Sequence, residues 1–254
     1  GDDPEDLYDF SGNHLANWGI DYSLIVKKVQ LFGEAATGND HWAFVNGLLL
    51  NVNKYATFSL LYRNLSSGYI SLNSSVFCEN SSQNNEEGFY AGLVLHPAPK
   101  VSISGYVDFY RFPWLKTNLS VPASGGDYLL QVDYKATKKT TMYLRIKYKS
   151  NPVDGASGTQ LPDIDDDQRS GIRYHLNYKA GRSITMQNRV EMVITRVGTA
   201  KASRGVMAYQ DVRYESEQLP LVLDARLAWF NTSDYSARIY AYENDMPFLF
   251  SIPA

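Results

Sequence analysis

The sequence predicts an all-β fold, an antiparallel up-and-down transmembrane β-barrel of about 12–16 strands. Three observations predict it. Apolar and polar side chains alternate with a period of two, most of the alternating segments are 9 to 12 residues long, and short connections alternate with long ones. A tilted strand of about 9–11 residues crosses a bilayer, whereas strands of soluble sheets are most often about 5–6 residues long. Segment length therefore favours a membrane protein.

The alternating segments follow one another through most of the chain. In one of them, Val101, Ile103 and Val107 share one face, while Ser102 and Asp108 share the other. The polar face carries charges, which suits a barrel with lipid outside and a charged lumen inside. The expected strands, in order, are residues 18–26, 29–37, 42–52, 55–64, 88–97, 100–111, 127–136, 139–149, 169–179, 182–195, 204–215, 219–230 and 235–244, with a further start at 248.

Tight turns and longer loops alternate between these strands. The expected turns are residues 27–28, 53–54, 97–100, 137–138, 180–182 and 217–220. After a short first loop at 38–40, the other connections are long, namely 65–87, 112–126, 150–168 and 196–203. Because neighbouring strands run in opposite directions, we expect the turns at one end of the barrel and the loops at the other, as in outer-membrane barrels.

Aromatic residues recur near the ends of the expected strands. The chain has 19 tyrosines, 11 phenylalanines and four tryptophans. Amphipathic rings at that depth form girdles at the headgroups of a bilayer. The alternative is the general enrichment of aromatic residues in strands.

Composition bounds the remaining possibilities. The net charge of −3 gives no electrostatic case for a nucleic-acid-binding surface, and the single Cys78 excludes an internal disulfide framework. No run of 18 uncharged apolar residues occurs, so no transmembrane helix is expected. We expect residues 1–16 to be an N-terminal leader or linker and residues 17–254 to form the barrel, with truncation at the C-terminus.

The charged side chains of the polar face are the candidate site. They are expected to line the lumen, where they bond across the wall or face water. A hairpin centred between Gln218 and Leu219 would place Asp211 opposite Arg226, and Arg213 opposite Asp224. The lumen-lining charged residues are Arg63, Asp108, Asp133, Arg145, Lys147, Arg173, His175, Arg189, Glu191, Asp211, Arg213, Asp224, Arg226 and Arg238.

Signals for enzyme chemistry are weak. The four histidines have no metal-ligand spacing, and no nucleophile elbow, P-loop or dinucleotide-binding glycine pattern occurs. The acidic stretch 163–167 lacks the glycine and distal glutamate of an EF-hand loop, so a solvated loop is favoured over a calcium site. We therefore predict no catalytic residue, no metal and no cofactor.

Several segments resemble a known family. Residues 46–50, 59–64, 106–115, 209–214 and 237–245 look like the C-terminal barrel of Bacteroidota proteins that are usually labelled helix-hairpin-helix domain proteins. The resemblance covers nearly all of the chain and implies a barrel that continues with more strands. In that family a competence-protein-like DNA-binding region precedes the barrel. This chain has no helix-hairpin-helix repeats, so a role in DNA uptake is implied only by analogy and attaches to no residue here.

These observations predict a non-catalytic barrel of the bacterial outer membrane that acts as a pore, a conduit or a membrane anchor. Its expected partners are outer-membrane lipid and periplasmic or surface proteins. The alternative is a soluble all-β module that binds glycan or lipid and buries Leu130 and its neighbours in a core. A third hypothesis, a barrel hydrolase, would depend on His175.

Overall fold

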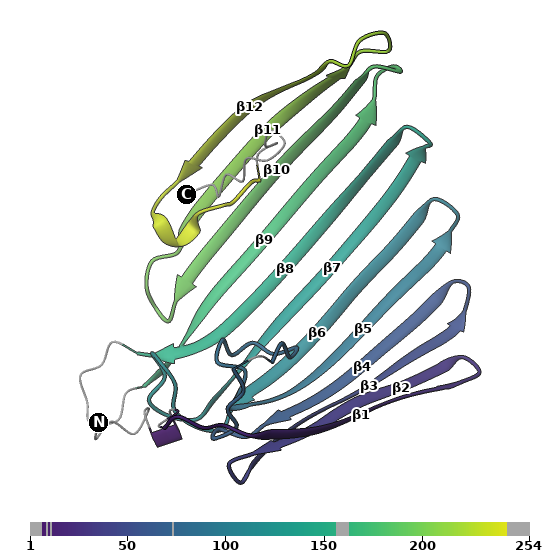
Figure 1. Cartoon of the computed structure of the whole chain (residues 1–254). Helices are drawn as coiled ribbons and strands as arrows, with labels where there is room; N and C mark the ends of the chain where they lie inside the picture. Colours follow the sequence, from purple (N-terminus) through teal and green to yellow (C-terminus); the bar gives the residue numbers. More distant parts are fainter. Residues whose placement is uncertain (1–6, 9, 11, 73, 156–162, 243–254) are drawn as a thin grey trace.

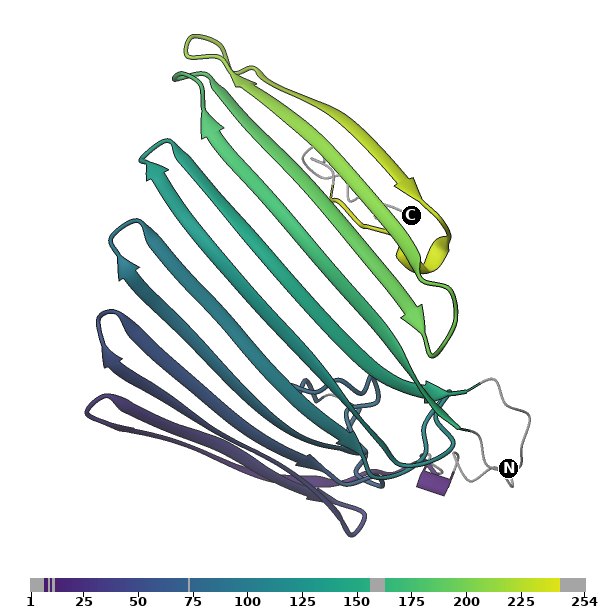
Figure 2. The same cartoon turned by 180° about the vertical axis from the view of Figure 1, so that it is seen from behind.

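The computed structural model describes residues 7–8, 10, 12–72, 74–155 and 163–242, and its main element is one twelve-stranded sheet (Figure 1). Each strand is antiparallel to the next along the chain, so the strands are ordered β1 to β12 (Figure 2). The all-β class and the up-and-down order are confirmed, with a strand number inside the predicted range. The strands are β1 (Asn17–Val26), β2 (Val29–Gly38), β3 (His41–Asn53), β4 (Ala56–Leu65), β5 (Glu86–Ala98), β6 (Val101–Phe112), β7 (Ala123–Thr137), β8 (Thr140–Asp154), β9 (Ile164–Lys179), β10 (Ile184–Val197), β11 (Ser203–Glu215) and β12 (Val222–Thr232).

Turns and loops lie at opposite ends of the sheet, as predicted (Figure 1). At the loop end, Asn39 and Asp40 have φ angles of 51° and 63°. A two-residue hairpin turn of type I′ requires positive φ at both positions, and Asn and Asp tolerate it. Two turns begin one residue later than expected, because β3 continues to Asn53 and β7 to Thr137. Both hairpins contain a register shift next to the turn, which the alternation pattern does not reveal.

The predicted strand at 235–244 is wrong. Tyr235–Ala237 form a short 3-10 helix, labelled η2, and residues 238–242 belong to no strand. Asp234 caps the helix, since its carboxylate accepts the N–H of Ser236 at 2.7 Å. The chain then turns away from the sheet edge, and arginine side chains of the sheet hold its carbonyl groups. The further start expected at residue 248 lies outside the described residues.

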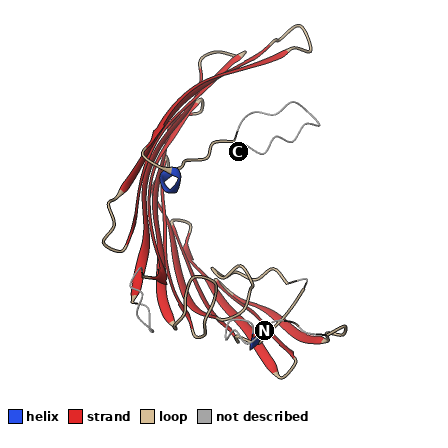
Figure 3. Ribbon diagram, turned by 90° about the vertical axis from the view of Figure 1, so that its left-hand side faces the viewer, coloured by secondary structure: helices blue, strands red, loops and turns tan. Residues whose placement is uncertain are grey.

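The sheet is bent into an arc with a convex and a concave face (Figure 3). Residues that lie directly opposite one another in neighbouring strands share a face. One such row crosses the whole convex face and is apolar apart from one glycine and one asparagine. The row consists of Val26, Val29, Leu50, Phe58, Leu93, Gly105, Leu130, Ile146, Ile172, Met192, Val206 and Asn231.

The convex face is not packed against other parts of the described chain. Leu130, Ile146 and Ile172 are exposed by 49%, 48% and 45%. The accessible surface is 17021 Å², whereas a soluble monomer of 28.6 kDa exposes about 11,000 Å². Within the described residues no second sheet covers Leu130 or Ile146. The core required by the soluble alternative is therefore not formed by this part of the chain.

Aromatic rings gather on the convex face near the loop end of β3, β4, β7 and β8. Trp42 stacks on Phe44 with ring centres 5.1 Å apart, and Tyr128 lies 5.9 Å from Tyr148. Just beyond this belt the convex face turns polar, and Arg111 and Glu87 form an ion pair at 2.9 Å. An aromatic belt between apolar and charged zones is the arrangement expected at a membrane interface.

The two outermost strands are edges. In the described residues β1 pairs only with β2, and β12 pairs only with β11. No helix in the described part of the chain is long and apolar enough to cross a membrane.

Candidate functional site on the concave face

The concave face collects the charged side chains. Arg189 and Arg226 donate hydrogen bonds to the carbonyl groups of Tyr240 and Tyr242. These two residues belong to the segment that follows η2, and this segment runs inside the arc (Figure 3). Most of the predicted lumen-lining residues lie on strands. Alternation along each strand and the register between strands place all of these on the concave face. Arg238 is the exception, because it follows η2 and lies on no strand. Its guanidinium contacts the Tyr235 ring at 4.0 Å instead of lining the wall.

A buried ion cluster lies at the loop end of β4, β5 and β6. Arg63 donates to Glu86 at 2.6 Å and, through both terminal nitrogens, to Asp108 at 2.9 and 3.1 Å. The three side chains are at most 2% exposed. Gly88 makes the cluster fit, because a Cβ at that position would lie 2.4 Å from Cζ of Arg63. Arg63 offsets one of the two negative charges and ties three strands together.

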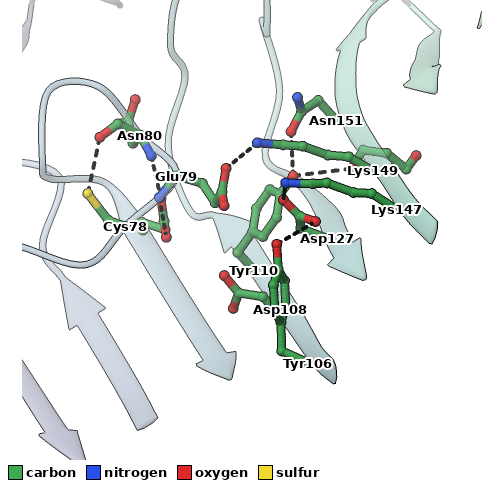
Figure 4. A network of polar contacts seen from close by, with 12 residues as sticks. Cys78, Glu79, Asn80, Tyr106, Asp108, Tyr110, Asp127, Lys147, Lys149 and Asn151 are labelled. Atoms are coloured by element: carbon green, nitrogen blue, oxygen red, sulfur yellow. Dashed lines mark hydrogen bonds and ion pairs between the residues drawn. The ribbon is translucent and has the colours of Figure 1, made fainter. Parts of the chain in front are cut away.

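Residues 66–72 and 74–85, here called the inner loop, fold over this cluster on the concave side (Figure 3). The Glu86 carboxylate accepts the backbone N–H groups of Glu79 at 2.8 Å and Asn80 at 2.6 Å. Farther across the sheet, Glu79 forms an ion pair with Lys149 of β8 (Figure 4). These contacts hold the inner loop against the wall rather than leaving it in solvent.

A second set of hydrogen bonds joins the inner loop to the loop between β6 and β7. Asn85 donates to the carbonyl groups of Trp114 and Leu115 at 2.9 and 3.1 Å, and accepts the N–H of Trp114 at 2.7 Å. Asn85 has a positive φ of 52°, which turns the chain into β5. The inner loop is thus fixed from the strand side and from the neighbouring loop.

The inner loop is also desolvated. Burial raises the pKa of the Cys78 thiol to about 11, with the nearby Glu86 carboxylate adding to the shift. The Cys78 thiol donates a hydrogen bond to the carbonyl of Asn80 at 3.2 Å. In the next loop, burial lowers the pKa of Lys116. Burial thus disfavours the charged forms of both the Cys78 thiol and the Lys116 amine. The inner loop is therefore packed against its neighbours.

The middle of the concave face continues the ion pairing on β6, β7 and β8. Asp127 lies directly opposite Asp108 in the register, a like-charge pair that needs cations on both sides. Arg63 binds Asp108, and Lys147 binds Asp127 at 2.9 Å. Tyr106 also donates to Asp127, at 3.2 Å (Figure 4). Each of these two carboxylates therefore contacts a different cation, and Arg63 is shared with Glu86.

On β9 and β10 one carboxylate serves two cations. Glu191 accepts from Arg173 at 2.8 and 3.0 Å and also pairs with Arg189 of its own strand. His175, next on the same face, stacks on Tyr143 with ring centres 5.1 Å apart. The arrangement is that of a charged wall, with His175 packed on an aromatic ring.

The predicted charge exchange on β11 and β12 is confirmed. Asp211 lies opposite Arg226 and Arg213 opposite Asp224. The Arg226 guanidinium binds Asp211 with two hydrogen bonds, one of 2.7 Å, and the side chains are 18% and 6% exposed. The second pair is looser at 3.5 Å, with side chains 45% and 31% exposed.

Sequence reasoning missed several charged residues of this face. Lys149 and Arg169 continue the two-residue period of Lys147 and Arg173, so alternation carried to the strand ends would have found them. Asp127 lies on the same strand as Asp133 and in the same two-residue period, so alternation would have found it too. Glu86 begins β5 two residues before the expected start, on the face of Gly88. No sequence signal places Glu79, because a polar loop does not reveal that it folds inward.

Charge is unevenly distributed over the concave face. Acidic side chains prevail over β1 to β6 and the inner loop, where Asp21 and Glu34 lie directly opposite each other. These two line a cavity of about 600 Å³ between the inner loop and the first four strands. Basic side chains prevail over β8 and β9. In the described residues no cluster of His, Cys, Asp and Glu could hold a metal ion, and every buried side-chain nitrogen and oxygen there has a hydrogen-bond partner.

Comparisons with known proteins identify no family. No family model and no curated protein sequence matches the chain. Among solved structures, the chain is similar to a loop L8 deletion mutant of OmpT, an outer membrane protein of Vibrio cholerae, with a TM-score of 0.40, 9% identity and coverage of 87% of this chain and 86% of that one. It is also similar to the toluene transporter TodX of Pseudomonas putida, with a TM-score of 0.34, 10% identity and coverage of 91% and 78%. No residue role is transferred from either protein, and the resemblance to helix-hairpin-helix domain proteins stays a prediction.

Proposed function

We propose that the chain forms the wall of a non-catalytic β-barrel in the bacterial outer membrane, and that its concave face lines a water-filled path. The observation that carries the proposal is the apolar row that crosses the convex face from β1 to β12. Lipid contact would remove this surface from water at a gain of roughly 25 cal/mol per Å². Charges confined to the other face need water or partners, which a lumen supplies.

The inner loop sets the width of this path. It lies on the concave side and is held by the Arg63 cluster and by the Glu79–Lys149 ion pair. Because these contacts reach from β4 to β8, the loop spans part of the arc instead of extending from its rim. We therefore propose a narrowed pore or conduit rather than a wide channel.

The two edges of the sheet must also be closed in a membrane. An unpaired strand edge exposes N–H and C=O groups, and in hydrocarbon each unsatisfied group costs several kcal/mol. We propose that β1 and β12 acquire further strand pairing in the membrane. Slow hydrogen exchange at the outward amides of both strands in detergent micelles would support closure, and rapid exchange would contradict it.

Conductance tests the path directly. The protein is reconstituted into planar bilayers, and the reversal potential is measured in a potassium chloride gradient. Lys147→Gln, on the concave face, should shift the selectivity towards cations. Arg111→Gln removes the same charge from the convex face and should leave the reversal potential unchanged. Equal shifts in both variants would contradict a lumen on the concave side.

The other hypotheses receive less support. The soluble module required Leu130 to be buried in a core, and in the described structure its convex face is open. The link to DNA uptake depends on the family resemblance alone and remains a prediction. The absence of catalysis is part of this proposal, and no observation of the structure singles out His175 for chemistry.

A further inference from the structure

The strongest concentration of positive charge lies where β8 and β9 meet on the concave face. Arg145, Lys147 and Lys149 come from β8, and Arg169 and Arg173 come from β9. We call these five residues the basic stripe. The register places Arg145 opposite Arg173 and Lys149 opposite Arg169. Directly opposed like charges destabilise a strand pair, and these two pairs flank the Lys147–Gly171 position, so the basic stripe needs compensating negative charge.

The basic stripe surrounds a cavity of about 310 Å³. Its other lining residues include Glu191 and Val193 from β10 and Ile239 and Tyr240 from the segment after η2. The volume is at the lower end of the range for small-molecule sites, about 300–1,000 Å³. The cavity therefore has room for a small ligand and walls from three parts of the fold.

The floor of the cavity is open at Gly171, which lies opposite Lys147. An added Cβ at Gly171 would meet only Met192 and Val193, both at 3.8 Å, which is ordinary contact distance. Backbone packing therefore does not require a glycine here, unlike at Gly88. The missing side chain instead leaves space between the cations of the two strands.

The carboxylates around the basic stripe do not balance it. Lys147 pairs with Asp127, Lys149 with Glu79, and Arg173 with Glu191. Five cations against three carboxylates leave an excess of two positive charges, and Glu191 is also shared with Arg189.

The two remaining arginines bind neutral acceptors. Arg145 donates to the side-chain oxygen of Gln131 at 2.7 Å, and Arg169 donates to the carbonyl groups of Ser236 and Arg238 at 3.0 and 2.7 Å. A guanidinium carries five donors in a planar fork that matches a phosphate or carboxylate group. Both arginines thus keep donors for a charged ligand.

We propose that the basic stripe is a binding site for a small multivalent anion that carries a phosphate group and enters from the path along the concave face. Phosphate suits the site because it presents several acceptor oxygens and two negative charges, which match the excess of two. Binding requires only the folded wall. It can therefore be measured in detergent micelles, and its failure is distinguishable from failure of the proposed pore.

The test measures the affinity of the full-length chain for inorganic phosphate by calorimetry at constant ionic strength. We expect saturable binding that sulfate competes with and chloride does not. Arg145→Gln and Arg169→Gln should each weaken binding about tenfold or more, because a hydrogen bond to a charged group is lost. Arg213→Gln removes the same charge from the concave face at β11 and should leave the affinity within about twofold.

A variant that fills the cavity distinguishes phosphate binding inside the cavity from general attraction by the positive charges of the concave face. Gly171→Leu leaves every charge in place but fills the floor of the cavity, so it should abolish phosphate binding. It also keeps the test decisive if an arginine variant does not fold, which circular dichroism checks. The inference is overturned if chloride displaces phosphate equally well, if Arg213→Gln weakens binding as much as Arg145→Gln, or if a folded Gly171→Leu variant binds phosphate unchanged.

Discussion

At the scale of single residues, the Asp211–Arg226 pair tests the register of β11 and β12. Single neutralisations leave a largely buried charge unpaired and should lower the free energy of unfolding, and the double neutralisation should recover part of the loss. Because the pair is bidentate and mostly covered, we expect a coupling of about 1 kcal/mol, at the top of the range for cross-strand pairs. A double-mutant cycle in urea unfolding measures it.

The Arg213–Asp224 pair is the matched control for that cycle. It has the same residue types on the same two strands, but its charged atoms are 3.5 Å apart and more exposed. Its coupling should be smaller, because water screens exposed pairs. Equal couplings would mean that the difference in burial between the two pairs is absent in solution.

Cys78 reports on the packing of the inner loop. Only the thiolate reacts with alkylating reagents, and a pKa raised to about 11 leaves little thiolate at pH 8. Alkylation at pH 8 should be roughly a hundredfold slower than for a free cysteine and should rise about tenfold per pH unit up to pH about 11. Stopped-flow or mass-spectrometric rates check this.

Release of the inner loop should reverse the protection of Cys78. Lys149→Gln removes the ion pair to Glu79, so the thiol should become hydrated and its alkylation faster. Lys100→Gln, at the opposite end of the sheet, serves as the control and should not change the rate. A fast reaction in the unaltered protein would show that the loop does not pack on the wall.

At the scale of elements, the same substitution at two glycines should change stability by very different amounts. Gly88→Ala places a Cβ 2.4 Å from the buried Arg63 guanidinium and should cost about 1–3 kcal/mol, as overpacking does. Gly171→Ala meets nothing closer than 3.8 Å and should change stability by less than about 0.5 kcal/mol. Urea unfolding of both variants measures the difference. Similar losses would refute the close packing assigned to the Arg63 cluster.

The strands themselves could be predicted from sequence, because period-two alternation is a local property. The hairpin at Glu215 and Val222 fixes which residues are opposed, so the Asp211–Arg226 pairing followed by counting. The inner loop could not be predicted, because its position depends on Glu86 accepting N–H groups of its own loop and on the distant Lys149. The strand predicted for the segment that includes and follows η2 was wrong for a similar reason. Its alternation fits a strand, but Asp234 and the arginines of the sheet redirect it.

At the scale of the whole molecule, the two faces should respond differently to charge. Leu144→Arg on the convex face should cost about 2–4 kcal/mol near the bilayer midplane, whereas Arg145→Ala on the concave face should disturb folding less. Refolding into lipid vesicles measures both costs. The reverse order would mean that the assignment of the faces is wrong.

The central claim is that the convex face contacts lipid and the concave face contacts water, and site-directed quenching tests it most directly. In a Cys78→Ser background, single cysteines along two neighbouring strands are labelled with an environment-sensitive fluorophore in reconstituted vesicles. The labelled positions are Leu130, Gln131, Leu144, Arg145, Ile146 and Lys147. Lipids spin-labelled near mid-chain should quench positions 130, 144 and 146, and aqueous iodide should quench positions 131, 145 and 147. Equal quenching at all six positions, or the opposite alternation, would contradict the membrane account.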